Sequence, residues 1–210
     1  MPDEQQLGLR ERKKADTRRA LSDAALALMF ERGLENVVRE DIAARAGVSV
    51  RTFNNYFAGK YDALVYRQLD RIRRGVEILR SRPAEEPLWD ALTTAMVEPL
   101  VEELTETGDL TPSREQLVQV RKLVEAPEVA AMMTKGIQEA VIAAIAERTG
   151  TDPEHDLYPR LVAAVASAAQ QAAFEIYVRS DPPQPIPVLI RQAMAALAAG
   201  LPEPPVQQRR

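Results

Sequence analysis

The chain has 210 residues, which at roughly 100 to 200 residues per domain allows one large domain or two small ones. It contains no cysteine and one histidine, which excludes disulfide scaffolds, thiolate catalysis, zinc fingers and multi-histidine metal sites, so no metal or other cofactor is expected. The formal net charge is −4, but residues 1–82 carry five more basic than acidic side chains, whereas residues 83–210 carry nine more acidic than basic ones. A basic front and an acidic back predict different partners for the two parts.

No uninterrupted apolar run approaches the roughly 18 residues that span a bilayer, and the N-terminal sequence MPDEQQLGLRERKK lacks the apolar core of a signal peptide. We therefore expect a cytoplasmic protein with no membrane partner.

The elements are expected to be helices throughout, because alanine and leucine dominate the long segments and no period-2 alternation is sustained. Prolines divide the chain into helix-length pieces. In chain order, nine helices are predicted over residues 9–32, 39–46, 49–57, 60–80, 89–106, 113–125, 127–148, 157–179 and 186–199.

The second and third of these segments form a predicted helix-turn-helix. Gly47 permits the sharp turn, Val48 fills the angle between the helices, and Ser49 can cap the second helix. Phe53 and Phe57 lie one turn apart and are expected to face inward.

The rest of that second helix is well suited to contact DNA. Arginine can donate to guanine, asparagine can pair with adenine, and threonine can offer a hydroxyl or a methyl group. The side chains left outside are Val50, Arg51, Thr52, Asn54 and Asn55, and Ser49 at the start of the helix is also expected to contact DNA. Tyr56 and Lys60 are expected to hold phosphates. The alternative for these residues is a solvated helix face.

A basic run precedes the motif and could follow the phosphate backbone or the minor groove. It comprises Arg10, Arg12, Lys13, Lys14, Arg18 and Arg19. The alternative is a mostly solvated run with one or two phosphate contacts.

Two motifs resemble the DNA-binding domain of TetR-type transcriptional regulators: the run DIAARAGVSVRTFNNYFAGKYDAL at residues 41–64, and the LxxAALxLM pattern that precedes Glu31, Arg32 and Gly33. The resemblance implies an all-α, two-domain fold with a DNA-binding head over residues 1–60. A body over residues 61–210 would bind a small-molecule effector and form a homodimer through its last two helices.

Two positions depart from the family pattern. The family usually has a hydroxyl residue where this chain has Val38 followed by Arg39, so Arg39 is expected to replace that phosphate contact. Asn54 stands where the family usually has an aromatic residue, which favours base reading by an amide.

The body resembles a subgroup of the same family that includes the mycofactocin-system regulator. The resemblance lies in VRKLVEAPEV at residues 120–129 and in AERTGTDPEHDLYPRLVAAVASAA at residues 146–169. It implies acyl-coenzyme A thioesters as the class of ligand.

Apolar residues of the body could line a cavity for such a ligand, since thioethers and aromatic rings adapt to varied apolar guests. The candidates are Trp89, Met96, Leu100, Leu117, Met132, Met133, Ile137, Phe174 and Tyr177, with Arg121 as a cation for an anionic ligand. The alternatives are plain core packing and, for Arg121, a surface salt bridge.

Small residues over 161–173 would let two helices approach closely, so this segment and 186–198 are predicted to build a four-helix interface across a two-fold axis. The predicted interface residues are Leu161, Ala164, Ser167, Ala168, Gln171, Ile190, Met194 and Leu197. The alternative is packing within one chain.

These features together predict a dimeric repressor that binds palindromic double-stranded DNA and is released by an effector. A DNA-binding protein without an effector remains the alternative. An enzyme with an all-helical carboxylate site would need paired Glu or Glu-x-x-His spacings, and the one histidine lies outside any such spacing.

Overall fold

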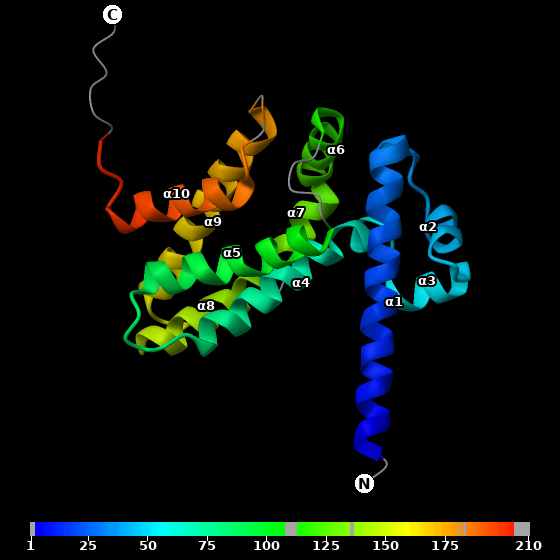
Figure 1. Ribbon diagram of the computed structural model, residues 1–210. Helices are drawn as coiled ribbons and strands as arrows, with labels where there is room; N and C mark the ends of the chain where they lie inside the picture. Colours follow the sequence, from blue (N-terminus) through cyan, green and yellow to red (C-terminus); the bar gives the residue numbers. More distant parts are fainter. Residues whose placement is uncertain (1–2, 108–112, 135–136, 181, 183, 204–210) are drawn as a thin grey trace, which may run out of the picture. The chain divides into compact units, whose positions relative to one another are not determined.

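The computed structural model describes residues 3–107, 113–134, 137–180, 182 and 184–203. Figure 1 shows its helices, with the short 3₁₀ turn η1 between α1 and α2: α1 (Asp3–Arg32), η1 (Leu34–Asn36), α2 (Arg39–Arg45), α3 (Val50–Tyr56), α4 (Lys60–Ser81), α5 (Leu88–Thr107), α6 (Arg114–Glu125), α7 (Pro127–Thr134), α8 (Ile137–Thr149), α9 (Leu157–Arg179) and α10 (Ile186–Ala198). Those residues contain no strand, so the predicted all-α fold is confirmed.

Each predicted helical segment is helical in the structure. The segment predicted as one helix over 127–148 contains both α7 and α8, and residues 135–136 between them lie outside the described residues. The first helix begins at Asp3, nearly two turns earlier than predicted, and ends at Arg32, which is followed by Gly33, whose φ of +84° favours glycine.

The chain packs as two compact units. The head unit comprises Met1–Arg71 and Ser113–Gly136, and the body unit comprises Ile72–Pro112 and Ile137–Arg210. The first half of α4 and the helices α6 and α7 therefore pack with the head. The predicted domain boundary at residue 60 does not coincide with the boundary between the packing units, which falls after Arg71. It separates the expected DNA-binding residues from the rest of the chain, and it stays a prediction.

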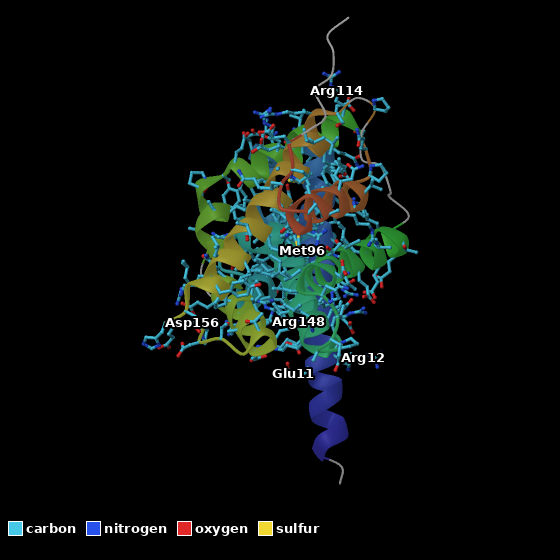
Figure 2. The ribbon with its side chains drawn as sticks, turned by 90° about the vertical axis from the view of Figure 1, so that its left-hand side faces the viewer. Glu11, Arg12, Met96, Arg114, Arg148 and Asp156 are labelled. Atoms are coloured by element: carbon cyan, nitrogen blue, oxygen red, sulfur yellow. The ribbon has the colours of Figure 1, made fainter. Side chains whose placement is uncertain are left out.

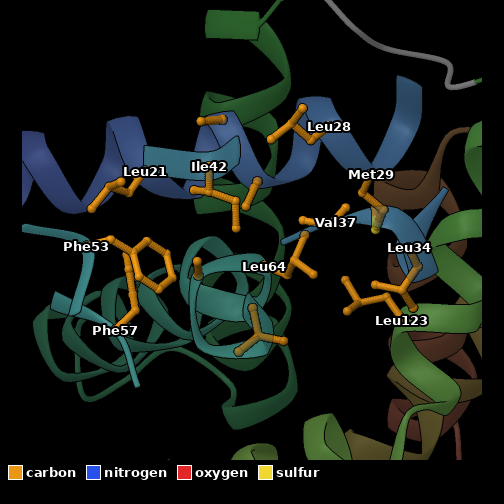
Figure 3. Close-up of a cluster of buried hydrophobic side chains, with 14 of the residues drawn as sticks. Leu21, Leu28, Met29, Leu34, Val37, Ile42, Phe53, Phe57, Leu64 and Leu123 are labelled. Atoms are coloured by element: carbon orange, nitrogen blue, oxygen red, sulfur yellow. The ribbon is translucent and has the colours of Figure 1, made fainter. Parts of the chain in front are cut away.

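One apolar cluster fills the head unit (Figure 3). The inward face of α1 meets residues of α2, α3 and α4, and Leu123, Ala126 and Val129 from α6 and α7 join the same cluster. Inside it, the Ser22 hydroxyl is fully buried and donates a 2.7 Å hydrogen bond to the Ala63 carbonyl, which joins α1 to α4. Burying a large apolar side chain of this cluster stabilises the fold by roughly 1.5 to 3 kcal/mol.

In the body unit, α10 packs on α5 and α9, and α8 packs on α9. A Cβ at Gly75 of α4 would lie 2.6 Å from the Ala95 carbonyl oxygen of α5, so only glycine allows these two helices to approach so closely. Arg148 of α8, labelled in Figure 2, donates hydrogen bonds to the carbonyls of Arg82, Pro83 and Glu86 in the α4–α5 connection.

Two helical stretches are long and apolar enough on average to cross a membrane: Pro127–Thr149 and Leu157–Arg179. Polar residues interrupt both stretches, so neither is an uninterrupted apolar run. Length and composition alone are weak grounds for a membrane span, because helices of soluble proteins also meet them.

Candidate nucleic-acid interface

The helix-turn-helix is built as its sequence predicts. Gly47 adopts a φ of +68°, and the Val48 N–H donates to the Ala43 carbonyl at 2.9 Å, which closes the turn after α2. The Ser49 hydroxyl then accepts a 3.0 Å hydrogen bond from the Thr52 N–H and so caps α3. Such a cap contributes about 1 kcal/mol.

Two aromatic rings hold α3 against the head core. Phe53 is fully buried and Phe57 is nearly so, with ring centroids 5.9 Å apart. The rings of Phe57 and of Tyr66 from α4 lie edge to face, with their centroids 5.6 Å apart. Figure 3 shows both phenylalanines pointing toward the cluster that contains Leu21. Because one face of α3 is anchored in this way, the opposite face is presented in a defined orientation.

The outward face of α3 carries the predicted base-reading side chains. Arg51, Asn54 and Asn55 are exposed, whereas Val50, Thr52 and Tyr56 are partly buried. The Thr52 hydroxyl lies 2.9 Å from the Ser49 hydroxyl, so these two groups are engaged in the cap. Arg51 makes no ion pair within the described chain, which leaves its five N–H donors available to an external acceptor.

Other cations near the motif are already paired within the head. Arg45 forms two hydrogen bonds to Glu31, at 2.5 and 2.6 Å, and this contact lowers the pKa of the Glu31 carboxyl and raises that of Arg45. Arg39 pairs with Glu40 at 3.0 Å, both side chains being more than half exposed. An exposed pair of this kind contributes little, so Arg39 can still exchange Glu40 for a phosphate, and its predicted role stays a prediction.

Lys60 lies at the start of α4 as predicted, but its ammonium has partners inside the head. Its Nζ donates to the Leu34 carbonyl at 3.0 Å and lies 5.5 Å from the centroid of the Tyr61 ring. A phosphate would have to compete with this hydrogen bond. The predicted phosphate contact is neither confirmed nor contradicted.

No local pattern in the sequence indicates the contacts that hold η1. The Leu34 N–H donates to the Gln119 side-chain oxygen at 2.9 Å, and Lys122 pairs with Glu35 at 2.8 Å, so two side chains of α6 hold the turn that precedes α2. Gln119 lies 85 residues from Leu34 in the sequence, and no local motif marks either residue as half of a contact.

The predicted ligand-binding residues are divided between the two units. Leu117, Arg121 and Met132 belong to the head unit, where Leu117 is buried, and Arg121 forms the surface salt bridge that was the alternative for it, 2.8 Å from Glu125. Met132 packs against the head core, and the side chain of Met133 lies outside the described residues. The set is therefore not brought together in one unit.

The remaining candidates lie in the body unit. Leu100 and Tyr177 are buried, and the rings of Phe174 and Tyr177 lie 6.2 Å apart. The partly buried candidates are Trp89, Met96, Ile137 and Phe174. A separate surface groove of about 380 Å³ is lined by none of these residues but by Thr94, Glu98, Val101, Glu102 and Arg191. Its lining carries Glu98 and Glu102 together with Arg191, and Glu102 pairs with Arg74 at 3.1 Å.

The predicted dimer-interface residues are exposed on α9 but mostly buried on α10. On α9 the exposed residues are Leu161, Ala164, Ser167, Ala168 and Gln171, which leaves them available to a partner. On α10, Ile190 and Met194 are 2% and 1% exposed, so their predicted place in a dimer interface is wrong. They lie on the apolar stripe by which α10 packs within its own chain, and Leu197 is partly buried on the same stripe.

No group of three or more His, Asp or Glu side chains gathers as a possible metal site in the described parts of the chain.

Comparison with known proteins identifies both parts of the molecule. Residues 21–65 match the family described as bacterial regulatory proteins, tetR family, and residues 86–202 match the family described as the MftR C-terminal domain. The chain belongs to the TetR family. It is a DNA-binding transcriptional regulator, and the TetR resemblance of residues 41–64 and of the body is confirmed.

Two TetR relatives span most of the chain. The mycofactocin biosynthesis transcriptional regulator MftR of Mycobacterium tuberculosis is 26% identical over 86% of this chain and 88% of its own length. The HTH-type transcriptional regulator TcmR of Streptomyces glaucescens is 29% identical over 83% of this chain and 79% of its own length.

The TetR fold is also shared with solved structures. The Thermus thermophilus repressor FadR, solved in complex with lauroyl-CoA, has a TM-score of 0.55 at 18% identity and covers 92% of this chain and 99% of its own. At this identity the likeness concerns the fold.

Proposed function

We propose that this TetR-family regulator is a cytoplasmic, dimeric repressor that binds a palindromic operator and leaves it when a small amphiphilic effector binds. Residues 1–60 carry the DNA-binding function, and residues 61–210 carry the effector site and the dimer interface. The two copies of α3 enter successive major grooves, about 34 to 36 Å apart.

One observation carries the DNA-reading part of this proposal. α3 is anchored through Phe53 and Phe57, while Arg51, Asn54 and Asn55 are exposed on its free face. Arginine and asparagine are the side chains whose paired donors and acceptors distinguish guanine and adenine in the major groove.

Replacing Arg51 or Asn54 by alanine is expected to weaken binding to the operator by about 1 to 3 kcal/mol, roughly 5- to 150-fold, and to relax the base preference. The operator is obtained by selection from random duplexes with the unmodified protein, and affinities are measured by fluorescence anisotropy at fixed salt.

Arg73→Ala is the matched control, because Arg73 is an exposed arginine of the body unit without an ion pair in the described chain. Its operator affinity should equal that of the unmodified protein. An Arg51→Ala variant with unchanged affinity and base preference would show that α3 does not read the operator.

The effector part of the proposal is supported by the apolar candidates of the body unit and by the likeness to a repressor solved with lauroyl-CoA. An effector that couples to operator binding by the usual 1 to 3 kcal/mol would lower affinity about 5- to 150-fold. Such a shift suffices to release a repressor.

Lauroyl-CoA, lauric acid and free coenzyme A are the probes for this effector. We expect lauroyl-CoA to release operator DNA, measured by anisotropy, because it combines an acyl chain with an anionic head. Release by lauric acid but not by the thioester would assign a fatty acid instead. Unchanged affinity with all three probes would favour a DNA-binding protein without an acyl effector.

A further inference from the structure

The N-terminal part of α1 extends beyond the head core. Leu21 is the first buried residue of the helix, whereas residues 11–16, 19 and 20 are exposed and residues 17 and 18 are partly buried. Figure 1 shows this part of α1 continuing past α2 and α3 as one helix. The segment 11–19, called the α1 arm below, carries five basic and two acidic side chains.

The charges of the α1 arm are not neutralised within the described chain, unlike most cations of the head unit. Arg32, Arg45 and Arg67 each pair with a carboxylate, as do Arg39 and Lys122, and Lys60 bonds to a carbonyl. Arg12, Lys13, Lys14 and Arg19 form no ion pair in the described residues, and neither does Arg51 of α3. The uncompensated positive charge of the head is thus concentrated on the arm and on the face that reads DNA.

A helix that is polar on all sides and has no internal ion pairs buries little of its own surface. The α1 arm nevertheless continues α1 without a break, so its cations are spaced along the same helix that packs in the head core. This arrangement suits an extended anionic partner. The backbone that carries the cations is already helical, so less conformational entropy is lost when the partner binds.

The register of α1 selects one face of the arm. Lys14 and Arg18 are four residues apart and lie on the same face, and Arg18 lies over the ring of Tyr56 at the end of α3, 5.6 Å from its centroid. Arg12 and Arg19 are seven residues apart and share a different face, roughly 130° away at 100° per residue. The Lys14 face is therefore the one that adjoins α3.

We propose that the Lys14–Arg18 face of the α1 arm is a second DNA-contacting surface, which binds the sugar–phosphate backbone beside the groove entered by α3. The proposal rests on the DNA-reading role of α3. Lysine acts on phosphate as a point charge, so this surface adds affinity for every sequence and no base preference.

The experiment compares two double variants of equal charge in the full-length protein: Lys14→Gln with Arg18→Gln, and Arg12→Gln with Arg19→Gln. Binding to the selected operator and to a random 30-base-pair duplex is measured from low to moderate salt. A lost phosphate contact reduces the slope of log affinity against log salt concentration by about 0.9. We expect the Lys14 double variant to lose nearly two units per head on both duplexes and the Arg12 double variant to lose less than half a unit.

Lys14→Gln alone guards against an indirect effect through Tyr56, since the Lys14 side chain is exposed and forms no ion pair in the described residues. It should reduce the slope by about one unit per head with an unchanged melting temperature. Equal losses in the two double variants, or no loss in either, would overturn the proposal. The base-reading role of α3 is tested separately by Arg51→Ala. If α3 does not read bases, that variant leaves the base preference unchanged, independently of the salt slopes of the arm variants.

Discussion

Replacing Leu161 by glutamate is expected to convert the protein into a monomer that binds its operator about 10²- to 10⁴-fold more weakly, because the two heads no longer bind as one linked unit. Leu161 is 51% exposed in the single chain, and Leu157, Tyr158 and Ile176 are also large, apolar and exposed along α9. A charge placed among them would have to be desolvated in a dimer but not in a monomer. Sedimentation velocity measures the change from dimer to monomer.

Val101→Glu is the control for this variant. Val101 is 40% exposed on α5, so the substitution places the same charge on a different apolar surface position of the body unit. We expect a dimer with unchanged operator affinity. A Leu161→Glu protein that stays dimeric would place the interface elsewhere than on α9.

Replacing Arg148 by methionine is expected to lower the free energy of unfolding by about 2 to 4 kcal/mol, because a hydrogen bond from a charged donor contributes about 1.5 to 3 kcal/mol and three carbonyls, two of them partly buried, lose such a donor. The Arg148 side chain is 8% exposed, and its guanidinium donates to the Pro83 and Glu86 carbonyls at 2.6 Å and to the Arg82 carbonyl at 3.2 Å. The side chain of Glu86 is in turn held by Arg82, which lowers the pKa of the Glu86 carboxyl. Urea unfolding followed by circular dichroism measures the loss.

Arg73→Met is the corresponding control, since it removes an exposed arginine without an ion pair in the described chain and should change stability by less than about 0.5 kcal/mol. Arg148→Lys should lose nearly as much as Arg148→Met, because an ammonium lacks the planar fork that reaches several carbonyls together. Wild-type stability in Arg148→Met would mean that water satisfies the carbonyls equally well.

The helix-turn-helix was predictable from sequence because each of its features is local. The Ser49 cap, the Gly47 turn and the one-turn spacing of Phe53 and Phe57 all act within a few residues, and the structure confirms them. Solvent exposure of Arg51 and Asn54 followed directly from the burial of the two phenylalanines.

Contacts between distant segments were not predictable in this way. The bond between Leu34 and Gln119 depends on how α6 packs, which no local pattern specifies. On α10, the sequence shows an apolar stripe at helical spacing, but an apolar stripe predicts burial without saying whether its own chain or a second copy covers it. Ile190 and Met194 were assigned to the second copy, whereas their own chain buries them.

The contribution of α6 and α7 to the head core affects how the head can be produced and studied. A fragment that ends after α4 would lack Leu123, Ala126 and Val129, and it would leave the Leu34 N–H without its Gln119 acceptor. During synthesis, the head core is incomplete until the ribosome has passed residue 129. The head core that anchors α3 is therefore completed only after α5, a helix of the body unit, has already been made.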